Sequence, residues 1–289
     1  MTIPLVPAII HDPFLKYRPF PANPTTLFQA HWHEIIASFI FYIIIQQISA
    51  PICSKLFGKN YDNLKKSTKI NFDVHFTSMI QCIISILLFI PHLNNPHFQN
   101  RSLDPVGSLF GVTPFGSLCC SLTIGYFLWD ILVCIQHFKL FGIGFLFHGI
   151  AAMFAFGNGI FVPYCQPWAG AFLTFELSTP FVNLNWFASH LPTGTFSDKF
   201  IIINGLLLMI TFFSVRIVWG FYAVYQLYKD IQFTLNMINN FIPYSILILN
   251  LGLDCLNVFW FYKMVMIAKK KATGSSSTRK AAKEADKIE

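Results

Sequence analysis

Five ionisable side chains lie inside long apolar stretches of this sequence, where a charged group costs roughly 2.5–3.5 kcal/mol on scales of membrane insertion. Three are carboxylic acids, one is a guanidinium, and one is an imidazole, which can change its charge near neutral pH. They are Asp130, His148, Glu176, Arg216 and Asp254. Because ionisable groups in such stretches normally face the protein interior and find partners there, we predict that these five side chains line a common polar interior.

Helical spacing adds further polar residues to this set. The groups that share a helical face are Tyr126 with Asp130, then Glu176 with Thr179 and Asn183, then Asn250 with Asp254 and Asn257. Polar residues also link neighbouring helices structurally, and we favour that interpretation for the Asp254 group. For His148 the structural and functional interpretations stay equally open. For Glu176 we favour a functional role, because Pro180 leaves the Glu176 carbonyl without its helical donor and can kink the helix there.

The composition indicates what kind of elements position these residues. Apolar residues of the AVILMFWYC set make up 54% of the 289 residues, and charged residues make up only 11%. Soluble domains carry roughly 25% charged residues, so a surface this poor in charge cannot be mostly wet. The sequence therefore predicts an integral membrane protein.

Stretches of about 20 apolar residues, the length that a helix needs to cross a bilayer, recur along the chain. We predict an all-α protein with about seven transmembrane helices, at residues 33–53, 76–92, 115–136, 141–163, 167–189, 200–228 and 240–267. The fifth is the weakest because it holds Glu176, Thr179, Pro180 and Asn183. The sixth is longer than one bilayer requires.

The distribution of Lys and Arg predicts the orientation. With seven spans, 15 of the 20 Lys and Arg residues fall on the side of the C-terminus, four fall on the opposite side, and Arg216 lies within a span. Basic residues accumulate on the cytosolic side, so we place the C-terminus in the cytosol and the N-terminus in a lumen or outside. The expected divisions are a lumenal segment (1–31), a first helix with a basic loop (32–64), the main bundle (65–270) and a disordered basic tail (271–289).

Several classes of site are not indicated. The seven cysteines form no C-x-x-C pair and show no Cys/His spacing typical of metal binding, so we expect no disulfide, no metal and no cofactor. The positive charges lie in loops and in the tail rather than in a basic stripe, which argues against a nucleic-acid partner.

Three segments resemble the TLC-domain family, which includes the ceramide synthases. They are Gly125-Tyr126-Phe127-Leu128-Trp129-Asp130, then His148, then Glu176-Leu177-Ser178-Thr179-Pro180-Phe181-Val182-Asn183. The neighbourhoods of Arg216 and of Asn257 resemble the family's last two helices, so the likeness runs from about residue 65 to 270. It is nearest to a branch of small TLC-domain proteins, many of them uncharacterised. The resemblance implies six helices around a central cavity, a place in the endoplasmic reticulum membrane and a role in lipid homeostasis.

The resemblance also leaves two functions open. Ceramide synthases transfer an acyl group from acyl-CoA to a sphingoid amine with a His-His pair and two acids, whereas this chain has His148-Gly149 and has Glu176 with Thr179. One hypothesis is therefore a protein that binds a lipid or acyl chain, with Tyr126, Thr179, Asn183, Arg216, Asp254 and Asn257 as polar cavity residues. The alternative is an acyltransferase that uses acyl-CoA as co-substrate, with His148 as base or acyl acceptor and with Glu176 and Asp130 orienting it. A transporter ranks below both, because no inverted repeat is visible.

Overall fold

The computed structural model describes residues 9–272, and that range contains helices and no β-strand. Six of its helices are long and apolar enough to cross a membrane. They are α1 (Leu27–Phe57), α3 (Lys66–His92), α6 (Pro114–Gln136), α7 (Phe138–Phe161), the continuous run α10 (Asp198–Phe212), η4 (Phe213–Val218) and α11 (Trp219–Ile231), and α12 (Phe241–Ala272). These six lie where six of the seven predicted spans were placed, and the predicted tail beyond residue 272 lies outside the described residues.

The fifth predicted span is not one helix. It is divided into η2 (Gln166–Trp168), α8 (Ala169–Leu173), η3 (Thr174–Leu177) and α9 (Thr179–His190). Pro180 stands in the first turn of α9, where its missing N–H breaks no hydrogen bond. The helix is therefore interrupted just before this proline, next to Glu176, as the sequence suggested.

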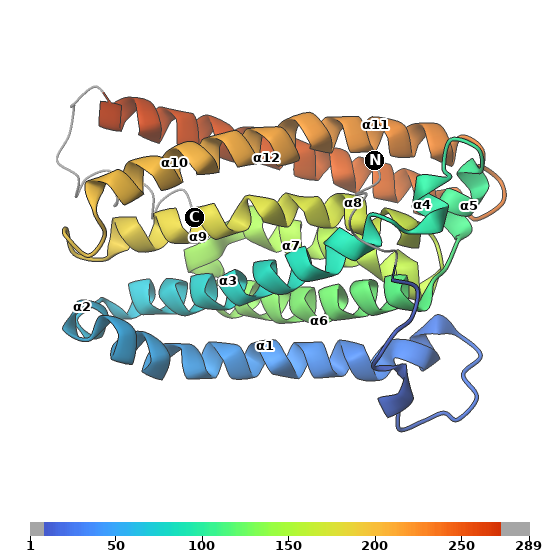
Figure 1. The fold of residues 1–289 in the computed structure, drawn as a ribbon, viewed down its shortest axis with the longest axis horizontal. Coiled ribbons are helices and arrows are strands. Elements are labelled where there is room, and N and C mark those ends of the chain that lie inside the picture. The colour runs from blue at the N-terminus through green and yellow to red at the C-terminus, as the bar shows by residue number, and fades with distance from the viewer. Residues whose placement is uncertain (1–8, 273–289) are drawn as a thin grey trace.

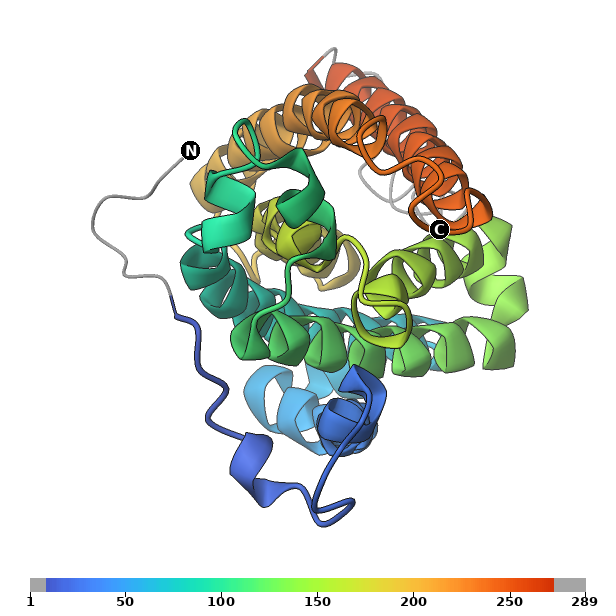
Figure 2. The same ribbon diagram turned by 90° about the vertical axis from the view of Figure 1, so that its right-hand side faces the viewer.

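This broken segment lies along the interior of the bundle. Both α8 and α9 contact α3, while α9 contacts α10 and α8 contacts α11, so the segment follows its neighbours over most of their length (Figure 1). Viewed from one end, α8 is enclosed by the other helices, whereas α1 lies outside them (Figure 2). The arrangement matches the expected bundle of six plus one additional N-terminal helix.

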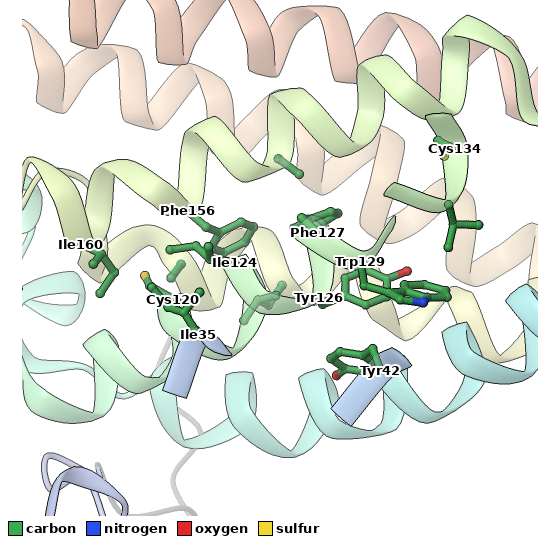
Figure 3. Packing of buried hydrophobic residues seen from close by; sticks show 14 of the residues in the cluster. Ile35, Tyr42, Cys120, Ile124, Tyr126, Phe127, Trp129, Cys134, Phe156 and Ile160 are labelled. Carbon is green, nitrogen blue, oxygen red and sulfur yellow. The ribbon is translucent and has the colours of Figure 1, made fainter. Parts of the chain in front are cut away.

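Helix α1 attaches to the bundle through small residues. A Cβ atom at Gly125 of α6 would lie 2.5 Å from Ser38 Cβ, so only glycine allows α1 to approach this closely. Ser38 Oγ donates to the Leu122 carbonyl (2.7 Å) across the same contact. An aromatic core that includes Tyr42, Tyr126 and Trp129 fills the adjoining space (Figure 3).

Shorter elements connect the long helices at the two ends. At one end are η1 (Leu15–Tyr17), α4 (Pro96–Gln99) and α5 (Pro105–Phe110), and α2 (Lys59–Asp62) lies at the other (Figure 1). At the first end, the Phe115 backbone N–H donates to the Ile10 carbonyl (3.0 Å). This hydrogen bond fastens the N-terminal segment to the start of α6.

Candidate functional site: a polar cavity at two irregular turns

Two departures from regular α-helix contact each other inside the bundle. One is the 3₁₀ turn η3, which carries Glu176, and the other is the π-helical turn η4, which carries Arg216. A π turn leaves a helix locally wide and often occurs at functional sites. Both turns lie well inside their helical runs, so the acid and the guanidinium are held far from either end of the bundle.

The Arg216 guanidinium joins the broken segment to α12. Its Nε donates to Ser178 Oγ (2.9 Å), and its Nη2 donates to Thr179 Oγ1 (3.1 Å). A longer contact runs from Nη1 to Asn257 Oδ1 (3.5 Å). The side chain also lies over the Phe212 ring, with 5.3 Å from Arg216 Cζ to the ring centroid. Neutral oxygens thus accept these hydrogen bonds of the buried cation, and the Glu176 carboxyl group lines the same cavity as Arg216.

A cavity of about 60 Å³ opens beside these turns. Its polar lining comprises Gln81, His148, Glu176, Arg216 and Asn250, whereas its apolar lining includes Phe127, Phe156, Phe172, Leu173, Phe175, Ile246 and Leu253. In the same measure a water molecule needs about 10–15 Å³, so several waters or a narrow part of a ligand would fit. A whole lipid would require the helices to separate.

The structure brings together three of the five predicted ionisable residues. His148, Glu176 and Arg216 all line the cavity. The His148 ring is held between aromatic neighbours, with its centroid 5.8 Å from the Phe127 ring and 5.9 Å from the Trp260 ring. Asn250, which spacing grouped with Asp254, lines the cavity as well.

Asp130 and Tyr126 do not line this cavity. Asp130 lies against the next helix at Gly149, where a Cβ atom would be 2.8 Å from Asp130 Oδ2. Tyr126 packs instead into the aromatic core, with its ring centroid 5.1 Å from that of Tyr42. The prediction that Tyr126 and Asp130 contribute to a shared interior with His148 is therefore not reflected in the cavity lining.

Three of the remaining predicted residues, Thr179, Asn183 and Asn257, link helices around the cavity. Thr179 and Asn257 accept hydrogen bonds from Arg216, and Asn183 pairs with His75 of α3, with 2.8 Å between Asn183 Oδ1 and His75 Nδ1. Asp254 is buried beside Gly220, where a Cβ atom would lie 2.9 Å from Asp254 Oδ1. Within the Asp254 group, the structure of residues 9–272 shows a hydrogen bond to another helix only for Asn257, while Asp254 Oδ2 is buried without one.

Gln81 is a cavity residue that the sequence analysis did not select. It lies in α3, is 2% exposed, and its Nε2 donates to Ser85 Oγ (2.7 Å). An amide four residues from a serine within an apolar stretch is a polar pair on one helical face, so the spacing rule that found the other groups would also have found this one.

Comparison with known proteins identifies the region that builds the cavity. Residues 71–266 match the family model described as the TLC domain. This range starts in α3 and ends in α12, so it excludes α1 and contains every polar residue of the cavity lining.

Several relatives match along most of their length. A Saccharomyces cerevisiae protein named topoisomerase I damage affected protein 4 is 37% identical over 273 residues, covering 93% of this chain and 95% of its own. An uncharacterized TLC domain-containing protein of Schizosaccharomyces pombe is 34% identical, covering 86% of this chain and 82% of its own. The human TLC domain-containing protein 4 is 30% identical, covering 78% and 82%. No solved structure matches the chain.

Proposed function

Because the chain belongs to the TLC-domain family, we propose that it is a multi-pass protein of the endoplasmic reticulum membrane that acts in lipid homeostasis by holding part of a lipid in its cavity. The observation that carries this proposal is the pairing of apolar walls with a few polar groups that converge on one region. Such a lining suits a ligand with one polar end and an apolar remainder.

The two irregular turns give the ligand a defined orientation. Glu176 and His148 offer a carboxyl group and an imidazole, and Arg216 adds a fixed positive charge beside them. Phe127, Phe156 and Phe172 line the apolar part. The polar end of the ligand would therefore lie near η3 and η4, with its hydrocarbon along the aromatic side chains.

A cavity-filling substitution tests this proposal. We expect Leu253→Trp to reduce labelling of the protein by a photoactivatable fatty-acid probe in membranes by at least about fivefold, because an indole would occupy the apolar section of the cavity. The matched control is Ile248→Trp, since Ile248 lies on the same helix but is 68% exposed on the outer surface. Equal labelling of the two variants would rule out ligand binding in this cavity.

Acyl transfer is the second candidate, because His148 and Glu176 line the same cavity. In that reaction the imidazole would accept the amine proton or the acyl group, and the carboxyl group would orient it. The close contact between Gly149 and Asp130 argues against a His-His pair, since an imidazole at residue 149 would collide with the Asp130 carboxyl group. Purified protein supplied with acyl-CoA and a sphingoid base tests this candidate, and a product rate no higher than that of His148→Ala would exclude it.

The distribution of Lys and Arg supports one orientation of the chain in the membrane. If the broken segment α8–η3–α9 crosses the membrane with the six long helices, the number of crossings is odd, as the Lys and Arg distribution predicts. We therefore propose a lumenal N-terminal segment and a cytosolic C-terminus.

A further inference from the structure

A second polar cluster lies away from the cavity, where the N-terminal segment meets α1. His31 and Glu34 lie three residues apart on one face of α1, and the folded-back N-terminal segment places Asp12 beside them. His31 Nδ1 is 2.9 Å from Glu34 Oε2 and 3.3 Å from Asp12 Oδ2. One donor atom from each residue can be chosen so that all three lie within 4.8 Å of one another.

The cluster is buried. The exposed fractions of the side chains are 0% for Asp12, 3% for His31 and 2% for Glu34. Two carboxylates face the His31 imidazole, and the His33 ring adds a longer contact, with 3.7 Å between His33 Nε2 and Glu34 Oε1. Asp12 Oδ2 and Glu34 Oε1 are buried without a hydrogen bond. Burial of carboxylate oxygens that make no hydrogen bond is costly, so a cation placed among them would be stabilised.

The surrounding chain holds the three residues in place. Phe14 N–H donates to Asp12 Oδ1 (2.8 Å), so one oxygen of that carboxylate is oriented by the local turn. Trp32 Nε1 donates to the Phe20 carbonyl (2.8 Å), and Phe115 N–H donates to the Ile10 carbonyl (3.0 Å). The N-terminal segment is thus fixed to both α1 and α6 on either side of Asp12, which gives the cluster the rigidity that a metal site needs.

We propose that Asp12, His31 and Glu34 bind a divalent transition-metal ion, with zinc as the preferred occupant. Zinc accepts imidazole nitrogen together with carboxylate oxygens at about 2.0–2.2 Å, which separates tetrahedral ligands by about 3.4 Å. The two distances from His31 Nδ1 are close to that separation. The ion would occupy the position of the Nδ1 proton, and His31 would coordinate as a neutral imidazole.

The donor set also distinguishes zinc from other divalent ions. Calcium takes six to eight oxygen ligands and magnesium prefers octahedral oxygen, so neither suits one nitrogen and two carboxylates. Three protein ligands leave one tetrahedral position for water. The bound ion would fasten the N-terminal segment to α1, a role separate from that of the lipid cavity. This proposal departs from the expectation drawn from Cys/His spacing, because two of the three ligands are carboxylates and one is distant in sequence.

Metal binding by the full-length protein in detergent tests the proposal. The protein would carry a tag without histidines and would be stripped with a chelator, then titrated with zinc, calcium and magnesium chlorides and assayed for bound metal. We expect one zinc per chain and affinities for calcium and magnesium at least about tenfold weaker. Asp12→Asn and Glu34→Gln should each weaken zinc binding at least tenfold. His11→Asn is the matched control, because His11 is exposed and directly precedes Asp12.

A second measurement separates a metal site from a hydrogen-bonded cluster. Zinc should raise the thermal unfolding temperature of the stripped wild-type protein and of His11→Asn, but not that of Glu34→Gln. Cobalt substituted for zinc should give visible absorption bands of a tetrahedral nitrogen–oxygen site in the wild-type protein that are lost in His31→Ala. The proposal is wrong if the wild-type protein and Glu34→Gln bind zinc equally, or if zinc leaves the unfolding temperature of the wild-type protein unchanged.

Discussion

Gly149 offers the sharpest test of how the helices around the cavity fit together. A Cβ atom there would lie 2.8 Å from Asp130 Oδ2 and 3.0 Å from Ile131 Cγ1, both on α6. Ordinary van der Waals contact begins near 3.4 Å, so the carboxyl group would have to withdraw by about 0.6 Å and the isoleucine by about 0.4 Å. Gly149→Ala therefore introduces two close contacts at a helix interface.

The expected cost follows from two opposing effects. Overpacking of an interior typically costs about 1–3 kcal/mol, whereas replacing a helical glycine with alanine returns up to about 1 kcal/mol. The net change in the free energy of unfolding for Gly149→Ala should be a loss of about 0–2 kcal/mol. Gly205→Ala is the matched control, because Gly205 is helical and a Cβ atom added there would have no heavy atom of another element within 4 Å. That variant should gain up to about 1 kcal/mol.

Thermal unfolding in detergent would compare the two alanine variants, each alone and combined with Asp130→Ala. Removal of the carboxyl group eliminates the closer of the two contacts, so the cost of Gly149→Ala should fall by about 0.5 kcal/mol or more in the Asp130→Ala background. The argument that residue 149 is tightly packed would be refuted if Gly149→Ala lost the same unfolding free energy in both backgrounds. Equal stability of Gly149→Ala and Gly205→Ala would refute it too, and residue 149 could then accommodate a larger side chain.

Two further predictions concern Arg216 and the orientation. Arg216→Met should lower the free energy of unfolding by about 2 kcal/mol, because it removes three hydrogen bonds worth about 0.6 kcal/mol each within a membrane. Thermal unfolding measures this loss, and Lys229→Met at the exposed end of α11 is the control, since equal effects of the two variants would contradict the linking role of Arg216. For the orientation, a membrane-impermeant thiol reagent should label Lys59→Cys in intact microsomes but label His11→Cys only after permeabilisation. The reverse pattern would invert the proposed topology, and the wild-type protein gives the background from its native cysteines.

The long helices could be predicted because a bilayer fixes their minimum length and their apolar character. Their ends could not, and α1 begins at Leu27 rather than at residue 33 because Thr26 Oγ1 accepts from the Gln29 backbone N–H and caps it. The interruption near Glu176 was visible in Pro180 and the polar residues around it. Six of the seven predicted spans are long helices in the predicted order and the fifth is broken, whereas the exact limits of the helices depended on caps and folded-back segments.

The site was predictable in part. Periodicity groups residues by helical face, but it does not give the rotation of a helix within the bundle. Tyr126 packs against Tyr42 of α1 and Asp130 lies at Gly149, while His148 and Glu176 line the cavity. The Asp12 cluster was invisible to the sequence because its ligands meet only after the N-terminal segment folds back along α1.

The π turn at Phe213–Val218 sets how α11 is rotated about the helix axis relative to α10 within one 34-residue helix. Before the turn, Asn204 Nδ2 donates to the Phe181 carbonyl of α9 (3.0 Å), and after it Trp219 Nε1 donates to the Ala171 carbonyl of α8 (2.8 Å). Deleting one residue from the turn would rotate α11 by about 100° relative to α10. One helix could then no longer follow both halves of the broken segment, so this stretch tolerates substitutions far better than insertions or deletions.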